Sequence, residues 1–193
     1  VLHLDVYGGR VFSYLVAATT TWALNRRFTF TQADPSSPFN QIQNGEVTSR
    51  GIETSLTTNL TPEFKMVASF TGFNLFISED INPGLLGKRP VAIPRLLASL
   101  WGDYTFKTGP LTGFGFGGGV RHVGASFADQ ANTLVVPSRT LFDAALHYEW
   151  QQWRAAVNVA NVADKLFVST CDGITSCFYG ERRKATFSLA YRW

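Results

Sequence analysis

The feature that most constrains this chain is an alternation of apolar and polar residues with a period of two. The pattern is clearest from Leu141 onward, where one face carries apolar and aromatic side chains: Phe142, Ala144, Leu146, Tyr148 and Trp150. A second run with the same period begins at Trp153, and only Gln151 and Gln152 separate the two runs. Two amphipathic strands joined by two residues predict a tight β-hairpin.

The composition indicates what these strands face. Charged residues make up 16% of the chain and aromatic residues 14%, whereas soluble domains usually contain about 25% charged residues. The mean hydropathy is only +0.01, and no run approaches the roughly 18 apolar residues of a transmembrane helix. A chain that is poor in charge but lacks long apolar runs is typical of strands that present every second side chain to lipid. The net charge of +3 comes without a basic cluster, so nucleic acid is not an expected partner.

The same pattern recurs along the chain and predicts about eight antiparallel strands, near residues 21–31, 47–60, 63–77, 95–107, 111–124, 139–150, 152–163 and 181–193. Short links near residues 61, 109 and 151 alternate with long ones, predicted at 32–46, 78–94, 124–138 and 164–180. Outer-membrane barrels show this alternation, with short periplasmic turns and longer extracellular loops. Residues 1–20 have no clean period, and 10–23 faintly resemble a signal peptide, although an unusual strand is the favoured interpretation.

Aromatic side chains are predicted to cluster where strands reach the short turns, as in the girdle of a membrane barrel. The pairs are Tyr104 and Phe106, Tyr148 and Trp150, and Tyr191 and Trp193. The opposite face carries a glycine row at 113–119 and polar residues that suit a wet or plugged lumen: Asp143, His147, Glu149 and Arg192. A soluble β-sandwich with an aromatic core and a soluble barrel for apolar ligands are the alternatives. An all-β transmembrane barrel is the favoured fold class.

The two cysteines, Cys171 and Cys177, lie in a segment rich in turn-forming residues. A disulfide within this loop is the favoured interpretation and implies an oxidising compartment; two unpaired thiols are the alternative. A metal site would require more ligands nearby, and His3, His122 and His147 have no ligand spacing. We expect no metal site and no catalytic cysteine.

The last ten residues, KATFSLAYRW, place apolar side chains at every second position back from a terminal aromatic. This segment resembles the C-terminal assembly signal of outer-membrane proteins, carried here by Phe187, Leu189, Tyr191 and Trp193. The resemblance implies recognition by the barrel assembly machinery and a chain that ends at Trp193.

Several further segments resemble those of TonB-dependent siderophore receptors, most of all the ferrichrome or hydroxamate type. GEVTSRGIE at 45–53 and NVANVADK at 158–165 carry the resemblance most clearly, together with segments at 89–95, 100–104, 118–124 and 177–183. The resemblance covers about residues 40–193, and 1–30 match poorly. Family members have a barrel of about 22 strands with a plugged lumen. The chain is therefore expected to be a C-terminal portion without the plug domain, and an open, curved sheet when isolated, since two strand edges stay unpaired.

The resemblance implies a non-enzymatic function: an outer-membrane receptor and transporter that takes up a ferric siderophore, energised through TonB by the missing N-terminal region. Iron is expected only as the chelated substrate, with no cofactor. We expect ligand contacts from the loop aromatics Phe127, Phe178 and Tyr179, and outer surfaces that meet lipid or lipopolysaccharide. A self-contained eight-stranded barrel acting as an anchor or adhesin is the alternative function; a lipid-modifying enzyme is disfavoured because no Ser/His/Asp constellation is evident.

Overall fold

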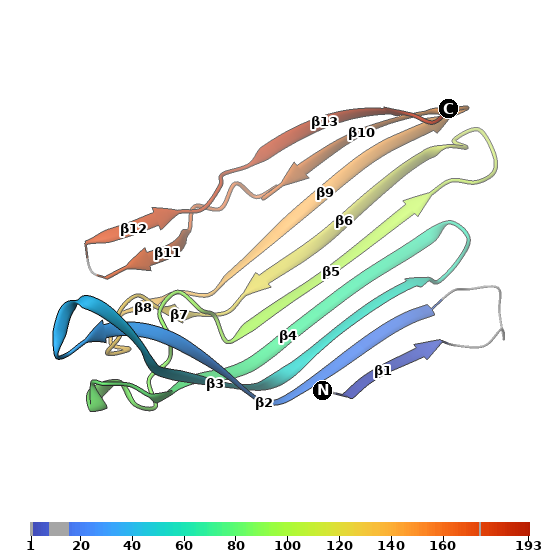
Figure 1. Ribbon diagram of the computed structural model, residues 1–193. Coiled ribbons are helices and arrows are strands. Elements are labelled where there is room, and N and C mark those ends of the chain that lie inside the picture. Colours follow the sequence, from blue (N-terminus) through green and yellow to red (C-terminus); the bar gives the residue numbers. More distant parts are fainter. Residues whose placement is uncertain (1, 8–15, 174) are drawn as a thin grey trace.

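A computed structural model describes residues 2–7, 16–173 and 175–193. They form an antiparallel sheet of nine tilted strands that curves but stays open, with β1 at one edge and β13 at the other (Figure 1). The strands, in sheet order, are β1 (Leu2–Tyr7), β2 (Val16–Asp34), β3 (Ser37–Asn59), β4 (Phe64–Glu79), β5 (Leu96–Thr105), β6 (Phe114–Val123), β9 (Arg139–Trp150), β10 (Trp153–Ala160) and β13 (Lys184–Tyr191). The expected all-β, open and curved sheet is confirmed.

Two small hairpins lie outside the main sheet. They pair β7 (Ser126–Phe127) with β8 (Val135–Val136) and β11 (Val168–Asp172) with β12 (Ser176–Tyr179). A short 3-10 helix, η1, spans Pro83–Leu85. In the described part of the chain, no helix has the length and apolar character needed to cross a membrane.

All eight predicted strands are present, and β1 adds a ninth in the region without a clean period. Residues 8–15 lie outside the described part, so the weaker signal-peptide interpretation of 10–23 can be compared with the structure only from residue 16, where the chain already belongs to β2. The predicted long loop at 32–46 is wrong. β2 and β3 continue through it as a paired ribbon, with Asp34 opposite Ser37. Most residues of this segment are polar, and backbone pairing beyond the membrane does not require apolar alternation.

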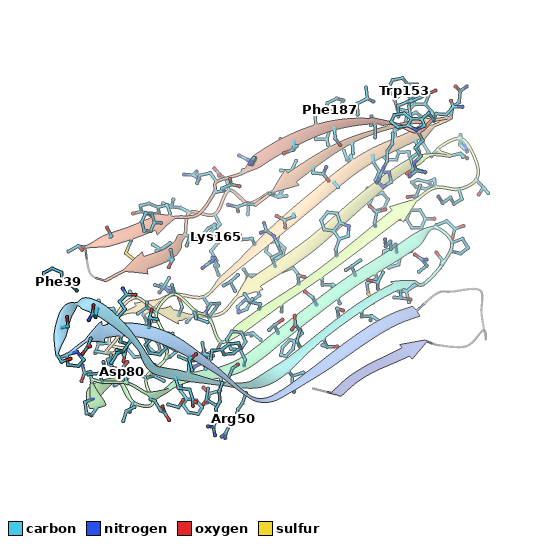
Figure 2. All side chains as sticks on the ribbon, in the orientation of Figure 1. Phe39, Arg50, Asp80, Trp153, Lys165 and Phe187 are labelled. Carbon is cyan, nitrogen blue, oxygen red and sulfur yellow. A yellow bond between two sulfur atoms is a disulfide. The ribbon has the colours of Figure 1, made fainter. Side chains whose placement is uncertain are left out.

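The strand register separates two faces. Leu146, Val157 and Phe187 are neighbours across β9, β10 and β13, and all three are exposed. The alternation of apolar and polar residues therefore placed these side chains correctly on one exposed face, the face that is predicted to meet lipid. The aromatic residues at the short-turn end of this face form a chain of ring contacts: Tyr148, Trp150, Trp153 and Tyr191, with successive centroids 5.4, 6.4 and 4.8 Å apart. Figure 2 shows Trp153 of β10 at this end of the sheet and Phe187 of β13 further from it. The expected girdle is present.

Interlocking side chains cover the other face, which is the lumen side of a barrel. A side chain at Gly117 or Gly119 would collide with the Trp101 indole, and one at Gly115 would collide with His147. His147 is buried and its Nε2 lies 3.2 Å from both carboxylate oxygens of Asp103. The glycine row therefore leaves room for large and polar residues of neighbouring strands, which explains why the row lies on this face.

Candidate functional site

The longer connections gather at one end of the sheet (Figure 1). They are the loop 80–95, the segment 124–138 with its β7–β8 hairpin, the segment 161–183 with its β11–β12 hairpin, and the extended tip of β2 and β3. The long-loop end of an outer-membrane barrel faces the exterior. A ligand that arrives from outside would therefore meet this end first.

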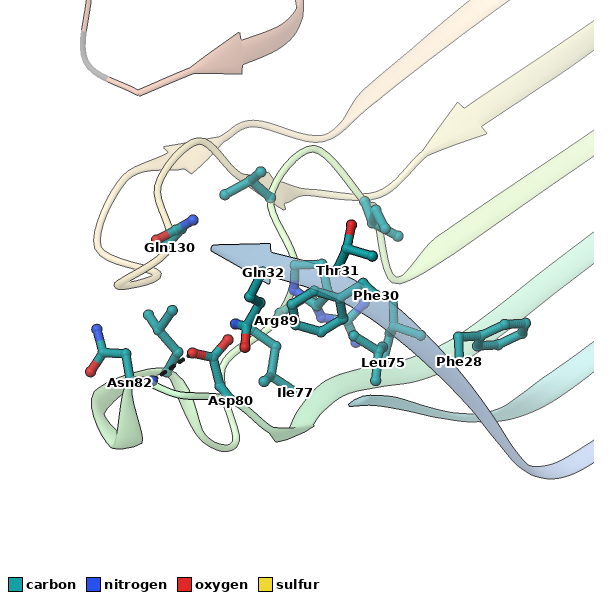
Figure 3. A pocket seen from close by; sticks show the side chains of 15 residues that line it. Phe28, Phe30, Thr31, Gln32, Leu75, Ile77, Asp80, Asn82, Arg89 and Gln130 are labelled. Atoms are coloured by element: carbon teal, nitrogen blue, oxygen red, sulfur yellow. Dashed lines mark hydrogen bonds between the residues drawn. The ribbon is translucent and has the colours of Figure 1, made fainter. Parts of the chain in front are cut away.

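A pocket of about 880 Å³ lies at this end, between the outer parts of the first strands and the loop 80–95 (Figure 3). Phe28 of β2, Val47 of β3 and Ile77 of β4 share one face, since Phe28 pairs with Val47 and Val47 pairs with Ile77. Phe30 and Leu75 extend the apolar wall. The polar lining comes mainly from the loops and the strand ends: Gln32, Asp80, Asn82, Arg89 and Gln130. The pocket can hold an apolar body and offers a few polar groups for orientation.

Asn132 holds together the two loops beside the pocket. Its side-chain oxygen accepts from the Arg89 backbone N–H at 2.7 Å, and its Nδ2 donates to the Arg89 carbonyl at 2.9 Å. A third bond runs from the Ala92 N–H to the Phe127 carbonyl at 2.8 Å. Asn132 has a φ of +60°, a conformation that Asn tolerates better than most residues. These bonds fix loop 80–95 against loop 124–138 and so define one wall of the pocket.

The Arg89 side chain is buried to 3% exposure. Its Nη2 donates to the Phe73 carbonyl at 3.2 Å and to the Asn74 side-chain oxygen at 3.1 Å, which ties the loop to β4. Its Nε and Nη1 have no hydrogen-bond partner among the described residues. Burial lowers the pKa of the guanidinium, with repulsion from Arg95 adding to the effect, yet an arginine stays charged at neutral pH. Arg89 thus brings an uncompensated positive charge to the pocket.

Asn161 anchors the base of the 161–183 segment. It is buried at 2% exposure, and its Nδ2 donates to the carbonyls of Lys165 at 2.9 Å and Glu181 at 3.2 Å. Its Oδ1 accepts from the Lys165 N–H at 2.9 Å, and its own N–H donates to Asp143 at 2.8 Å. A single amide therefore joins the chain leaving β10 to the chain entering β13.

Asp164 adds an ionic link at the same place. Its carboxylate accepts from the Arg182 guanidinium at 2.8 and 2.5 Å and from the Arg183 N–H at 2.9 Å. These bonds hold the pKa of Asp164 well below its usual range. The bonds from Arg182 make the largest contribution, and the bond from the Arg183 N–H makes the next largest. Because the folded-state pKa is depressed, the stabilisation is complete above the ordinary pKa of about 4 and is lost as the pH falls through the lowered value. The link is therefore intact at neutral pH.

The structure spreads the predicted ligand contacts over two loops. Phe127 lies in β7, where its carbonyl binds loop 80–95, while Phe178 and Tyr179 are exposed on β12. Tyr179 borders a smaller recess of about 320 Å³ that also includes Lys165 and Phe167. None of the three predicted aromatics lines the 880 Å³ pocket.

A disulfide joins Cys171 and Cys177, which lie opposite each other on β11 and β12. It closes a short loop immediately before the two exposed aromatics Phe178 and Tyr179. Such a link stabilises chiefly by restricting the unfolded hairpin, here by about 2 kcal/mol for a short loop.

Replacing both cysteines with serine is therefore expected to loosen the β11–β12 hairpin without affecting membrane insertion. Limited proteolysis of the inserted receptor should cleave the variant faster within 168–179, and the heat-modifiable band of the folded barrel should remain. Equal cleavage rates with and without the disulfide would contradict this expectation.

Sequence reasoning did not identify the residues that line the larger pocket. Phe28 and Phe30 were assigned to a strand but to no site, and Arg89 belonged to a segment, 89–95, noted only for its resemblance to the family. The one available signal was the apolar alternation of Phe28 and Phe30, which continues along the strand toward the long-loop end. The described residues include no group of three or more His, Cys, Asp or Glu side chains that could hold a metal ion.

The open sheet of tilted strands, the lipid-facing girdle and the gathered loops define the class of protein: part of an outer-membrane receptor barrel. The family model described as "TonB dependent receptor-like, beta-barrel" matches residues 3–162. The chain belongs to the TonB-dependent receptor β-barrel family and is an outer-membrane protein. The match begins at residue 3, so it includes residues 3–30 of the segment 1–30 that the motifs alone had matched poorly.

Curated relatives are receptors and transporters. The chain is 32% identical over 166 residues to the ferrichrome outer membrane transporter/phage receptor of Escherichia coli K12, covering 83% of this chain and 22% of the relative. It is 30% identical over 179 residues to the ferrioxamine B receptor of Salmonella typhimurium, covering 90% and 25%. The chain thus spans about a quarter of the length of the curated relatives that it matches.

Solved structures of the same fold include the ferric preacinetobactin receptor BauA of Acinetobacter baumannii, with a TM-score of 0.70, 22% identity and coverage of 92% of this chain and 27% of that one. The ferric yersiniabactin uptake receptor FyuA of Yersinia pestis also has a TM-score of 0.70, with 14% identity and coverage of 98% and 29%. At these identities the likeness shows the fold.

Proposed function

We propose that this chain forms the C-terminal barrel portion of a receptor that binds a ferric siderophore at the outer surface and transports it inward with energy supplied through TonB. The observation that carries the proposal is the lumen-side pocket at the long-loop end, with Phe28, Phe30, Leu75 and Ile77 in its wall. The names of the curated ferrichrome and ferrioxamine relatives support a hydroxamate-type ligand.

The expected partners fit the same proposal. An N-terminal plug would fill the lumen and contact TonB, and the lipid-facing strands would meet lipid and lipopolysaccharide. Assembly would begin with the terminal segment, where Phe187, Leu189 and Tyr191 alternate on one face of β13 and Trp193 follows. The alternative of a self-contained barrel finds less support, since β1 and β13 occupy opposite edges of the described sheet.

The decisive experiment is ligand binding and uptake by the whole receptor. A strain that lacks its other hydroxamate receptors and expresses this one should take up iron-55 delivered as a ferric hydroxamate siderophore, and uptake should stop when TonB is deleted. Uptake that is absent with every hydroxamate, catecholate and carboxylate siderophore offered would refute the proposal.

Phe178 and Tyr179 remain proposed ligand contacts on the disulfide-linked hairpin. Both side chains are exposed at the long-loop end, and exposed aromatic residues are the usual anchors of a binding surface. Changing both to alanine in the whole receptor should weaken siderophore binding about tenfold, or ~1.4 kcal/mol, with normal membrane insertion. The dissociation constant is measured by titrating the ligand and following the intrinsic fluorescence of the receptor. Leu111→Ala serves as the control, because Leu111 is exposed at the opposite, short-turn end. An unchanged dissociation constant would remove these two residues from the site.

A further inference from the structure

The Arg89 guanidinium is poorly satisfied for a group so deeply buried. Its contacts are two neutral oxygens, both on Nη2, and two of its three nitrogens have no partner among the described residues. Buried charges are normally paired with an opposite charge or fully hydrogen-bonded, because removing a charge from water is costly. The fold keeps an arginine here although an uncharged residue would avoid that cost.

No carboxylate of the described residues compensates this charge. Asp80 is the one acidic residue in the described lining of the pocket, and its Oδ1 accepts from the Asn82 N–H at 2.7 Å instead of pairing with Arg89. The charged neighbour that acts on Arg89 most strongly is Arg95, which has the same sign. The local field at this wall of the pocket therefore favours an anion.

The remaining lining determines what kind of anion fits. Phenyl and branched aliphatic side chains form most of the wall: Phe28, Phe30, Val47, Leu75, Ile77 and Ile93. Figure 3 shows Arg89 and Phe30 among the side chains that line the pocket. A small inorganic anion would leave the apolar surface uncovered, whereas a ligand with an apolar body and one acidic group would contact both parts. A carboxylate suits an unpartnered guanidinium N–H, because hydrogen bonds between an ionised donor and an ionised acceptor are shorter and stronger than those between neutral groups.

We propose that Arg89 is a specificity-determining residue of this pocket and selects a ferric siderophore that carries a free carboxylate. The inference rests on the proposed function and deepens it: the receptor distinguishes an anionic ligand from an otherwise identical neutral one. Nε and Nη1 are covered in this arrangement of side chains, so the carboxylate reaches one of these two donors when the pocket side chains shift as the ligand enters. The Asn132 bonds fix the Arg89 backbone, and the Nη2 bonds to Phe73 and Asn74 keep the guanidinium in place during that shift.

The test compares two ferric trihydroxamates that differ only at one terminus, a free carboxylate in one and its methyl ester in the other. Binding to the purified whole receptor is measured by isothermal titration calorimetry. Wild type is expected to bind the acid roughly 10- to 100-fold more tightly than the ester, the range for hydrogen bonds to a charged group. Arg89→Gln should abolish this preference by weakening only the acid, and Arg89→Lys should leave a reduced preference, because it keeps the charge but loses the unpartnered guanidinium N–H groups. Arg95→Gln, which removes the same charge from an exposed position in the same loop, should retain the preference.

The possible outcomes distinguish the role of Arg89 in selectivity from a role in supporting the loop and from the proposed function. Equal affinity of wild type for acid and ester would overturn the role of Arg89 and leave siderophore binding intact. An equal loss of both ligands in Arg89→Gln, with the preference unchanged, would show that Arg89 only supports the loop. Failure of wild type to bind either ligand, or any other ferric siderophore, would refute the proposed function itself, and the inference with it. If Arg89→Gln does not fold, the comparison of the two ligands on wild type and Arg89→Lys decides the question.

Discussion

Replacing Asn161 with alanine is expected to destabilise the receptor by about 3 kcal/mol. The substitution leaves the Lys165 N–H and the carbonyls of Lys165 and Glu181 without their buried partner. It also places a residue with a Cβ but no compensating side-chain bond at a φ of +52°. The free energy of unfolding, measured by urea titration of the whole receptor refolded into lipid vesicles, should report this loss.

Asn161→Gly separates the two causes. Glycine adopts a positive φ without strain, so this variant loses the hydrogen bonds but not the backbone fit, and it should be less destabilised than Asn161→Ala. Equal losses would attribute the whole effect to the hydrogen bonds. A loss below about 1 kcal/mol in both variants would contradict the anchoring role, since a single net hydrogen bond already contributes that much.

Val157→Arg is expected to lower the free energy of unfolding by about 2–4 kcal/mol, the penalty for a basic side chain near the middle of the lipid-facing surface. Val157 lies in the central part of β10 and pairs with Leu146 and Phe187 on the exposed apolar face. The same titration in lipid vesicles measures the loss, and the fraction of receptor that inserts should fall as well.

The adjacent residue provides the matched control. Asn158 is exposed on the opposite face of the same strand, where it pairs with Ala145 and Thr186. Asn158→Arg should therefore cost much less than Val157→Arg, because its charge enters a wet lumen. The reverse order would show that the two faces have been exchanged, and equal penalties would contradict the assignment of one face to lipid and the other to the lumen.

Much of the fold could be predicted because alternation is a local property. Leu141 to Trp150 and the run from Trp153 specify two strands and their faces with no knowledge of the rest of the chain, and Gln151 and Gln152 leave room only for a tight turn. The polar segment 32–46 was predicted wrongly for the same reason. Outside the membrane both faces of a strand are wet, so the local pattern that distinguishes strand from loop disappears.

The site depends on contacts that no local pattern encodes. Arg89 and Asn132 are 43 residues apart, yet the two loops meet through them. Phe28 and Ile77 share a pocket wall because the register of β2, β3 and β4 brings them to one face. Aromatic residues in long loops were reasonable candidates for ligand contacts, but which of them faces a cavity depends on how each loop folds back.

The sequence by itself therefore determined the all-β class, the lipid-facing and lumen-facing sides, the terminal aromatic segment and the resemblance to siderophore receptors, because a period of two and short motifs are written in neighbouring residues. Only the tertiary structure decided that β1 adds a ninth strand to the sheet, that residues 32–46 extend a ribbon, and that Arg89 is buried without a counter-charge beside an apolar pocket. The physical reason is that burial and charge pairing are properties of residues distant in sequence, which strand register and loop packing bring together.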